Sequence, residues 1–318
     1  MKQKCFVGID TSNYTTSVAV CDFDGNIVAN LKSPLSVKEG ERGLRQSDAL
    51  FAHTKNMPEL MERLSHILEE YVPVAIGCSE RPRSIEGSYM PCFLSGVAVA
   101  KSMCAVSGIP LYGFSHQDGH IEAAYYSSGA DVGGDFAAFH VSGGTTEILY
   151  VKRKSDGFSV ELVGGTKDLN AGQCIDRTGV MMEMKFPCGA EMDRLATNFT
   201  EKPKGIKIST EGMYCNLSGV ENQVAKLYES TKDKTLVSAY TFEYIAKTLY
   251  SMTDALRNEY PDIPIIYAGG VMSSTYIKER LSVKRKNIYF AKPDFSADNA
   301  AGIALLCRKK HLRKQERI

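Results

Sequence analysis

Ala137-Ala-Phe-His-Val-Ser-Gly-Gly-Thr-Thr-Glu-Ile-Leu-Tyr-Val151 is the stretch of this chain that decides its fold. Apolar runs rich in β-branched and aromatic residues flank a turn at Ser142–Thr146, a pattern that predicts a β-hairpin. The two glycines of the turn leave backbone N–H groups uncovered by side chains, so an anion could approach them closely. For a single hairpin, a turn without any ligand would be the better interpretation.

A second copy of the pattern stands at the beginning of the chain. Gly8-Ile-Asp-Thr-Ser-x-x-Thr-Thr-Ser-Val-Ala-Val20 also combines an apolar strand, a polar turn and a Thr-Thr pair that leads into another strand. One repeat separated by more than a hundred residues predicts two related domains rather than a solenoid. The length of 318 residues agrees, because it is long for one hydrophobic core.

The composition, 43% hydrophobic and 24% charged with a formal net charge of +1, is that of a soluble globular protein. Nine cysteines without a CxxC pair indicate reduced thiols rather than a disulfide framework. The first residues lack the pattern of a signal peptide, and no apolar run reaches the length of a membrane helix. We therefore expect a cytoplasmic protein without a membrane partner. The basic C-terminal cluster predicts a solvated face, or alternatively a polyanion contact: Arg308, Lys309, Lys310, Arg313, Lys314 and Arg317.

A third glycine turn follows the strand pattern 263–268, in Gly269-Gly270, and helix patterns alternate with strands along the chain. This alternation predicts an α/β fold with a mixed sheet in each half. Two facing hairpin turns and a strand-Gly-Gly-helix element could together hold a nucleotide, the layout of actin, sugar kinases and Hsp70. We therefore predict two actin-like ATPase domains around a central cleft. Neither a P-loop nor a GxGxxG motif is present.

His116-Gln-Asp-Gly-His120 places two imidazoles four residues apart, on one face of a helix and within reach of one transition metal. A lone HxxxH motif more often has a structural explanation. A third ligand would be needed, and Asp298 is the best acidic candidate. The general-base glutamate of an HExxH metalloprotease is absent.

Taken in order, several motifs of the chain resemble the tRNA threonylcarbamoyladenosine synthase family (TsaD), long described as glycoprotease or O-sialoglycoprotein endopeptidase. The resemblance covers nearly the whole length. The matching segments are Gly8-Ile-Asp-Thr-Ser12, His116-x-x-Gly-His120, Val141-Ser-Gly-Gly144, Asp168-x-x-Ala-Gly172 with Asp176, Pro187-x-Gly189, Ala268-Gly-Gly-Val271 and Asp298-Asn299.

The resemblance implies an enzyme that transfers a threonylcarbamoyl group from threonylcarbamoyl-AMP to N6 of adenosine 37 in tRNA. It implies one divalent metal, Fe²⁺ or Zn²⁺, and an adenine nucleotide, ATP or threonylcarbamoyl-AMP, as substrate or ligand. Its implied partners are tRNA and, in a bacterium, a TsaB-like paralogue and a TsaE-like ATPase. The implied domains are residues 1–133 with 298–318, and residues 134–297.

The resemblance also implies a role for particular residues of this sequence. His116, His120 and Asp298 would hold the metal, while Asp10, Thr11 and Ser12 would form the phosphate turn of the first domain. The expected substrate and nucleotide contacts are His140, Val141, Ser142, Gly143, Gly144, Asp176, Gly189, Asp193 and Ser274.

At four positions the chain departs from the family pattern. Tyr14 and Thr15 stand in place of an acidic pair, Thr145 in place of a histidine, and Ser274 in place of an asparagine. A divergent paralogue would show this combination of retained metal ligands and altered substrate positions. The alternative hypotheses are therefore a non-catalytic scaffold or binding subunit, and an enzyme that transfers a carbamoyl or phosphoryl group to another acceptor.

Overall fold

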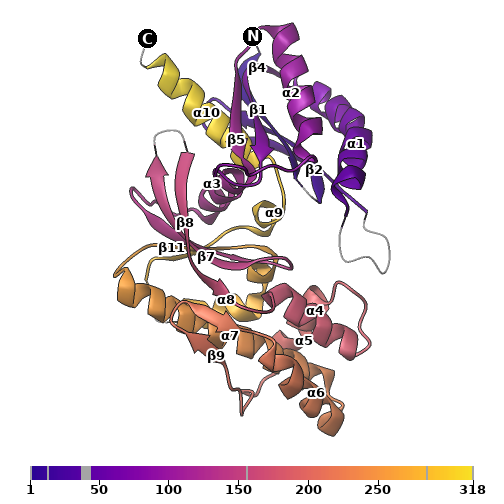
Figure 1. The fold of residues 1–318 in the computed structure, drawn as a ribbon, viewed down its shortest axis with the longest axis vertical. Helices are drawn as coiled ribbons and strands as arrows, with labels where there is room; N and C mark the ends of the chain where they lie inside the picture. Colours follow the sequence, from indigo (N-terminus) through magenta and orange to yellow (C-terminus); the bar gives the residue numbers. More distant parts are fainter. Residues whose placement is uncertain (1, 13, 37–43, 155–156, 284–285, 317–318) are drawn as a thin grey trace. The chain divides into compact units, whose positions relative to one another are not determined.

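The computed structural model describes residues 2–12, 14–36, 44–154, 157–283 and 286–316 (Figure 1). The chain divides into two compact units. The first comprises Met1–Ser127, Arg153–Ser159 and Ala297–Ile318, and the second comprises Ser128–Lys152 and Val160–Ser296. The domain boundaries expected from the sequence stay a prediction.

The first unit is built on a five-stranded mixed sheet with the order β3-β2-β1-β4-β5. Strand β1 pairs antiparallel with β2 and parallel with β4. The strands are β1 (Gln3–Ser12), β2 (Thr15–Asp22), β3 (Ile27–Pro34), β4 (Tyr71–Arg81) and β5 (Leu111–Ser115). The helices are α1 (Gln46–Ile67), α2 (Phe93–Ser107), α3 (His116–Ser128) and α10 (Ala301–Gln315).

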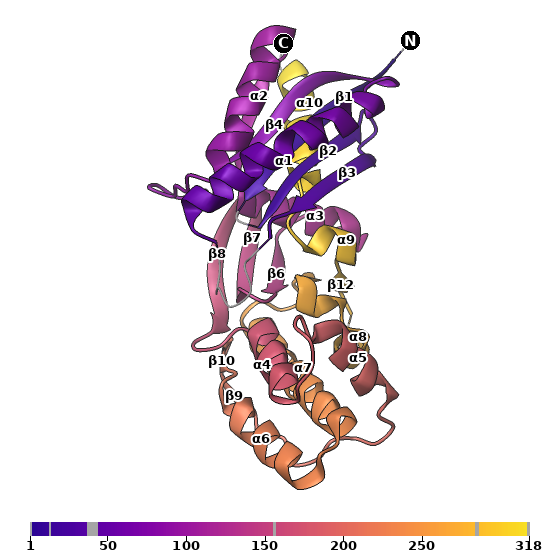
Figure 2. The ribbon, with the colours of Figure 1, turned by 90° about the vertical axis from the view of Figure 1, so that its right-hand side faces the viewer.

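Alternate side chains of β1 face different helices, because successive residues of a strand point to opposite faces of the sheet. Cys5, Val7 and Ile9 pack into the apolar core shared with α1 and α2. Gly8, between them, lies against α10 instead. Figure 2 shows α1 and α10 on opposite faces of this sheet. Asp10 follows Gly8 by two residues and therefore points to the α10 face.

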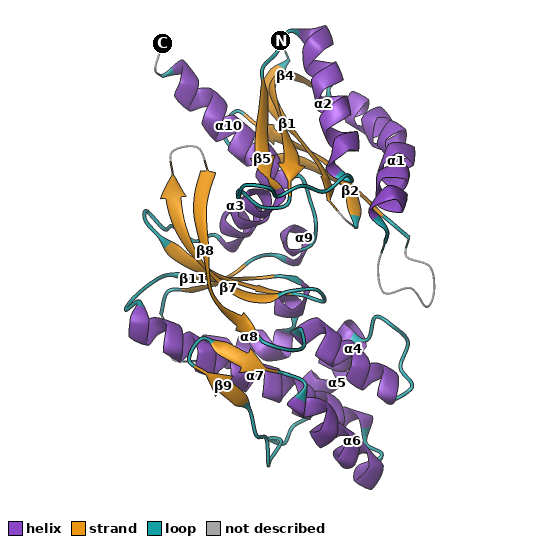
Figure 3. Cartoon of the chain, viewed as in Figure 1, coloured by secondary structure: helices purple, strands orange, loops and turns teal. Residues whose placement is uncertain are grey.

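The second unit contains a seven-stranded sheet with the order β12-β11-β6-β7-β8-β10-β9. The strands are β6 (Phe136–Val141), β7 (Thr146–Lys154), β8 (Gly157–Thr166), β9 (Ser209–Glu211), β10 (Tyr214–Asn216), β11 (Ile265–Ala268) and β12 (Ile288–Phe290). The helices are α4 (Ala171–Met181), α5 (Gly189–Asn198), α6 (Gly219–Thr231), α7 (Lys234–Glu259), η1 (Gly270–Ser273), α8 (Thr275–Ser282) and α9 (Pro293–Ser296) (Figure 3). Helix α7 contributes the largest share of the buried core residues.

The two sheets share one topology. In the second unit the order β8-β7-β6-β11-β12 repeats the order β3-β2-β1-β4-β5 of the first. Strand β6 pairs antiparallel with β7 and parallel with β11, as β1 does with β2 and β4. The duplication predicted from the two hairpins is confirmed, and β9 and β10 extend the second copy.

Local hydrogen bonds set where two helices begin. Helix α4 begins at Ala171, because Asp168 accepts hydrogen bonds from the N–H groups of Leu217 and Ser218 and stays outside the helix. Helix α10 begins at Ala301, where the Asn299 side chain accepts a bond from the Ala301 N–H. Strands β9 and β10 form a short antiparallel pair at the edge of the second sheet.

Candidate functional site

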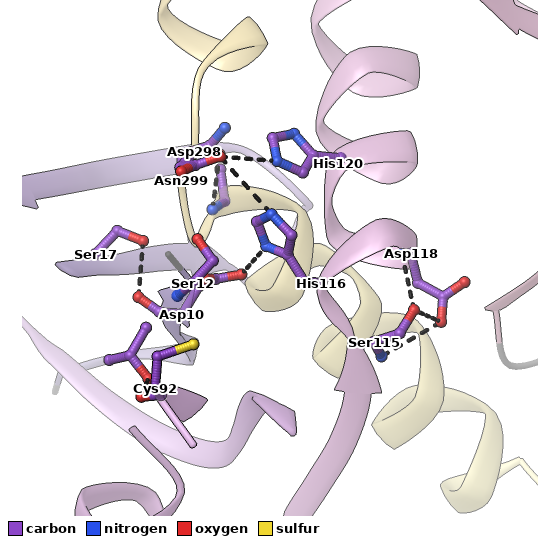
Figure 4. A network of polar contacts seen from close by, with 12 residues as sticks. Asp10, Ser12, Ser17, Cys92, Ser115, His116, Asp118, His120, Asp298 and Asn299 are labelled. Carbon is purple, nitrogen blue, oxygen red and sulfur yellow. Dashed lines mark hydrogen bonds and ion pairs between the residues drawn. The ribbon is translucent and has the colours of Figure 1, made fainter. Parts of the chain in front are cut away.

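His116 and His120 lie one turn apart on α3, as the four-residue spacing predicts, and both point toward Asp298 in the segment before α10 (Figure 4). The Nε2 atoms of His120 and His116 lie 3.1 and 3.7 Å from Asp298 Oδ1. One ligand atom from each of the three residues falls within a group no wider than 4.8 Å. Their side chains are 17–22% exposed, so a small substrate could reach the group from solvent.

Asp10 lies behind His116. Its Oδ2 atom is 2.7 Å from His116 Nδ1, and its side chain is 1% exposed. Burial alone would raise the pKa of Asp10 and lower that of His116, but the mutual attraction overcomes it in both groups. The pKa of the Asp10 carboxyl is lowered, and the pKa of His116 is raised to about 9. In the metal-free protein the two groups therefore form a buried ion pair.

The donor set fits a transition metal. Two imidazole nitrogens and one carboxylate oxygen are ligands typical of zinc and of non-haem iron(II) sites with open coordination positions. A ligating histidine usually donates its other ring N–H to a carboxylate, which fixes the tautomer and the ring orientation. Asp10 meets this requirement, because a carboxylate can only accept and His116 Nδ1 must then carry the proton.

Two glycines bring Asp298 to the histidines. A Cβ atom added at Gly302 on α10 would lie 1.8 Å from the carbonyl oxygen of Gly119 on α3. One added at Gly8 on β1 would lie 2.5 Å from the backbone nitrogen of Ala304. Helix α10 therefore packs against α3 and β1 at backbone distance, and this close approach carries the preceding Asp298 to His120.

The strand ends that flank the β1–β2 turn of the first unit are buried, whereas Tyr14 in the turn is 43% exposed. The exposed fractions of Asp10, Thr11, Ser12 and Thr16 are 1, 0, 3 and 0%. The Thr11 hydroxyl donates to the Cys92 carbonyl at the start of α2. The expectation that Asp10, Thr11 and Ser12 contact phosphate stays a prediction.

The β6–β7 turn of the second unit is open. Ser142 N–H donates to the Thr145 carbonyl, which closes the predicted hairpin. Gly143 and Gly144 are exposed, and a Cβ atom added at either would meet no atom within 4 Å. The N-terminus of α4 abuts the turn, where Gly172 N–H donates to the Ser142 carbonyl. The Gly144 N–H donates to the Ser142 hydroxyl, and the positive end of the α4 dipole lies beside the turn, which favours an anion there.

The third glycine turn lies at the same sheet edge as the open turn. Strands β6 and β11 run parallel, so their carboxyl ends, Val141 and Ala268, meet at one edge. Gly269 has a φ of +102°, and a Cβ atom there would lie 2.2 Å from the Val141 carbonyl oxygen. His140 pairs with Ala268 in this ladder. Two of the expected nucleotide contacts, His140 and Val141, thus lie next to the Gly269-Gly270 turn.

Asp176 and Gly189 are also close together, because Asp176 accepts a hydrogen bond from the N–H of Cys188 directly before α5. Burial raises the pKa of Asp176, and space around Gly189 is open. Asp193 on α5 accepts bonds from the Ser274 hydroxyl and the Thr275 N–H. The Ser274 hydroxyl itself caps α8 by accepting from the Ile277 N–H. Asp193 and Ser274 therefore connect α5 to the start of α8.

Sequence reasoning missed three features: the Asp10–His116 bond, the Gly302–Gly119 approach, and a buried imidazole, His53. His53 Nδ1 lies 2.9 Å from the Thr16 hydroxyl, beside the first turn. The HxxxH motif could have prompted a search for a carboxylate partner of His116, but the sequence does not indicate which acidic residue it is.

The basic residues of α10 have partners within the first unit. Arg308 donates to the Phe23 carbonyl, Lys309 pairs with buried Glu122, and Lys310 and Lys314 lie over the Tyr112 ring. These contacts favour the solvated-face interpretation of the cluster, of which Arg317 lies outside the described residues. Among the helices of the described chain, none combines the length and apolarity needed to cross a bilayer.

Comparisons with known proteins match residues 50–305 to the family TsaD, tRNA N6-adenosine threonylcarbamoyltransferase. Proteins of that name from Streptococcus suis (strain 05ZYH33) and Streptococcus sanguinis (strain SK36) are both 27% identical to the chain. These alignments cover 96% of this chain and 92% and 91% of the two relatives.

Three solved structures resemble the whole chain. Full-length HypF in its phosphate- and nucleotide-bound form gives a TM-score of 0.61 at 14% identity, covering 97% of this chain and 46% of HypF. Component A of (R)-2-hydroxyglutaryl-CoA dehydratase from Acidaminococcus fermentans gives 0.57 at 16%, covering 97% and 99%. A ROK family glucokinase from Streptomyces griseus gives 0.51 at 12%, covering 96% and 99%. At identities this low, the similarity informs about the fold alone. It confirms the predicted actin-like ATPase class, with a mixed sheet in each unit.

Proposed function

Because the chain belongs to the TsaD family of tRNA N6-adenosine threonylcarbamoyltransferases, we propose that it moves a threonylcarbamoyl group from threonylcarbamoyl-AMP to N6 of adenosine 37 in tRNA. The family and the enzyme class, a transferase, are as the ordered motifs predicted.

One observation carries the proposal: the convergence of His116, His120 and Asp298, with Asp10 behind the first histidine. Sugar kinases of similar fold do not need a histidine pair, so its retention supports a metal enzyme of this family. We propose that these three residues hold one Fe²⁺ or Zn²⁺. When bound, such a metal would act as a Lewis acid that polarises the mixed anhydride of the donor.

We propose that Ser142, Gly143 and Gly144 bind the phosphate of the donor, with the α4 N-terminus adding its dipole. Asp176 and Gly189 would bind the ribose. His140 and Val141 would line the neighbouring strand end, while Asp193 and Ser274 would support the turn at α8. Hydrogen bonds from preorganised glycine amides to the leaving phosphate stabilise the charge that develops on it.

The bond changes of the reaction are simple. The N6 amine of adenosine attacks the carbamoyl carbon, a C–N bond forms, and the C–O bond to the phosphate breaks. AMP leaves with the electron pair, and N6 gives up one proton. The chain's residues would bind and orient the donor. In a bacterium, a TsaB-like paralogue and a TsaE-like ATPase would be the partners.

A second candidate function is a divergent paralogue, either a binding subunit or an enzyme with another acceptor. Ser274 favours it, because this residue replaces an asparagine and its hydroxyl is engaged with Asp193 and the α8 N-terminus. Tyr14, Thr15 and Thr145 add three further departures near the two turns.

The test is a transfer assay with purified chain, threonylcarbamoyl-AMP, expected partner subunits and tRNA that reads A-starting codons. Metal content is measured on the same samples. We expect a threonylcarbamoyl adduct on tRNA from the wild type, and loss of both metal and adduct in His116→Ala and His120→Ala. His66→Ala is the matched control, since His66 is an exposed imidazole in the last turn of α1 and is not one of the three proposed metal ligands. Metal binding without any adduct on tRNA would support the divergent paralogue instead.

A further inference from the structure

The two hairpin turns of the duplicated fold differ in what they offer to a ligand. Thr11 and Thr16, in the strands that flank the β1–β2 turn, are buried in the first unit, where protein groups bind their hydroxyls. Thr11 accepts from the Gly96 N–H and donates to the Cys92 carbonyl. Thr16 accepts from the Asn56 amide and contacts His53. These two hydroxyls are therefore engaged by the protein and not offered to a phosphate.

Asp10 is the one residue of this turn whose bond leads to the metal ligands. Its Oδ1 accepts from the Ser12 N–H at 2.8 Å, which holds the carboxylate against its own turn. Its Oδ2 accepts from His116 Nδ1 at 2.7 Å. Figure 4 shows the His116 ring between Asp10 and Asp298. With the Nδ1 proton held by Asp10, Nε2 is the ring atom left for a metal, and it lies 3.7 Å from Asp298 Oδ1.

Strand alternation explains why Asp10 is in this position. Gly8 and Asp10 share the face of β1 that meets α10, and the missing side chain of Gly8 allows Ala300 and Ala304 to approach the strand. The approach of α10 brings Asp298 near, and the next residue on the same face supplies the carboxylate for His116. The same packing contact thus places both the proposed metal ligand Asp298 and the carboxylate of Asp10 that supports His116.

We propose that Asp10, near the end of β1, is part of the metal centre: it is a positioning residue that orients His116, and phosphate is bound by the β6–β7 turn. The inference rests on the metal site of the proposed function. It changes the role of Asp10 from phosphate contact to support of a metal ligand. It also explains why one copy of the duplicated turn keeps a carboxylate and the other keeps two glycines.

The experiment measures two affinities in Asp10→Ala and Asp10→Asn. Zinc affinity is determined by competition with a chelator, and cobalt(II) substitution gives a visible spectrum that reports the ligand set. ATP affinity is measured by calorimetry on the same preparations. We expect Asp10→Ala to weaken zinc binding by about 10–100-fold and to alter the cobalt spectrum. The affinity for ATP should stay within about twofold.

Asp10→Asn retains a hydrogen-bond acceptor without the charge, so its zinc affinity should fall between wild type and Asp10→Ala. Thr16→Val is the matched control, because Thr16 is as buried in the same turn but bonds to His53 and not to His116. Its zinc affinity should equal that of the wild type, even if its thermal stability falls.

Three results would contradict the inference or its premise. If the Asp10 variants bind zinc as tightly as the wild type but bind ATP more weakly, Asp10 contacts the phosphate and does not support a metal ligand. Equal losses of zinc affinity in Thr16→Val and Asp10→Ala would show a general effect of the turn's stability. A wild-type chain without measurable zinc or cobalt binding would refute the proposed metal site itself. This failure is seen in the wild type alone, so it is distinguishable from a failure of the role proposed for Asp10. If Asp10→Ala does not fold, Asp10→Asn decides alone.

Discussion

The two turns Asp10–Thr16 and Ser142–Thr146 have the same place in two sheets of the same topology, yet their surroundings are opposite. At the first turn, Thr11, Thr16 and Asp10 bond to the start of α2, to α1 and to α3. The second turn exposes Gly143 and Gly144 beside a helix N-terminus. A duplicated fold can therefore keep the hairpin and give it different surroundings and different chemistry.

Glycines show the same division. Gly8 and Gly302 allow backbones to touch, since an added Cβ atom would overlap the backbone of another element. A Cβ atom added at Gly143 or Gly144 would meet nothing within 4 Å, so their backbone is open to approach. The close-contact glycines of the first unit thus help to bring Asp298 to His116 and His120, whereas Gly143 and Gly144 of the second unit are exposed. Substitutions at the two kinds of glycine should accordingly fail in different ways.

Gly302→Ala should give the largest effect. Its Cβ atom would lie 1.8 Å from the Gly119 carbonyl oxygen, so α10 must move away from α3. Overpacking of this kind costs about 1–3 kcal/mol and sometimes more, although alanine is otherwise the better helix former by about 1 kcal/mol. Thermal unfolding should show a lower Tm, and chelator competition should show weaker metal binding because Asp298 moves with α10.

Gly143→Ala is the control for this experiment, since its methyl group would meet no atom within 4 Å. Its Tm should stay close to that of the wild type. A Gly302→Ala protein with wild-type Tm and metal content would show that the close approach of α10 is not what places Asp298.

Gly172→Ala should come next, with a loss in nucleotide binding. A Cβ atom there would lie 2.6 Å from the Gly143 Cα, so the α4 N-terminus must separate from the open turn. We expect ATP affinity to fall by about tenfold, which corresponds to about 1.4 kcal/mol, while metal content stays unchanged. Gly134→Ala, at an open position of the same unit, is the control. An accompanying loss of metal content in Gly172→Ala would contradict the assignment of nucleotide binding to the β6–β7 turn and of metal binding to the first unit.

How much of the fold and of the candidate site could be predicted from the sequence depends on how far apart in the chain the interacting residues lie. Both hairpins and the helical HxxxH pair follow from local rules of turn chemistry and periodicity, and the structure contains them. The repeated Ser/Thr/Gly turns also indicated the duplication. Short strands such as β9 and β10 were missed, because three residues carry no periodic signal.

The buried bonds could not be predicted in the same way. Asp10 and His116 are 106 residues apart, and any buried carboxylate could have been the partner of His116. Asp298 is brought to the site by the Gly302 contact, which depends on how α10 packs and not on its own sequence pattern. Ser274 was expected to contact nucleotide, but only the structure shows that its hydroxyl is shared between Asp193 and α8.

Thr145→His tests the open turn by restoring the imidazole of the family pattern. The Thr145 carbonyl accepts the bond that closes the hairpin, and its half-buried side chain can be exchanged without losing that bond. We expect several-fold faster tRNA modification if the threonine only weakens the reaction, because a positioned imidazole can assist proton transfer. The rate of adduct formation under single-turnover conditions is the measurement. An unchanged rate would favour another acceptor.

His53 offers the smallest and most selective test of the closed turn. It is fully buried, and burial lowers its pKa despite opposing interactions with Ser12, Asp10 and Asp298. The unfolded chain, with a histidine pKa of about 6.5, therefore binds more protons than the folded chain as the solution becomes acidic. The free energy of unfolding should fall as the pH drops below about 6.5. Denaturant titrations from pH 7.5 to 5 should show this slope.

His53→Gln removes the titrating group but retains an acceptor for the Thr16 hydroxyl, so its stability should vary less over that range. His116 cannot supply the same slope, since its pKa is raised to about 9 and its stabilising contribution is complete below the unfolded value. The difference between the two proteins at each pH therefore isolates His53. If the difference does not change between pH 7.5 and 5, the imidazole is not held neutral by burial, and the turn is more open to water than its contacts indicate.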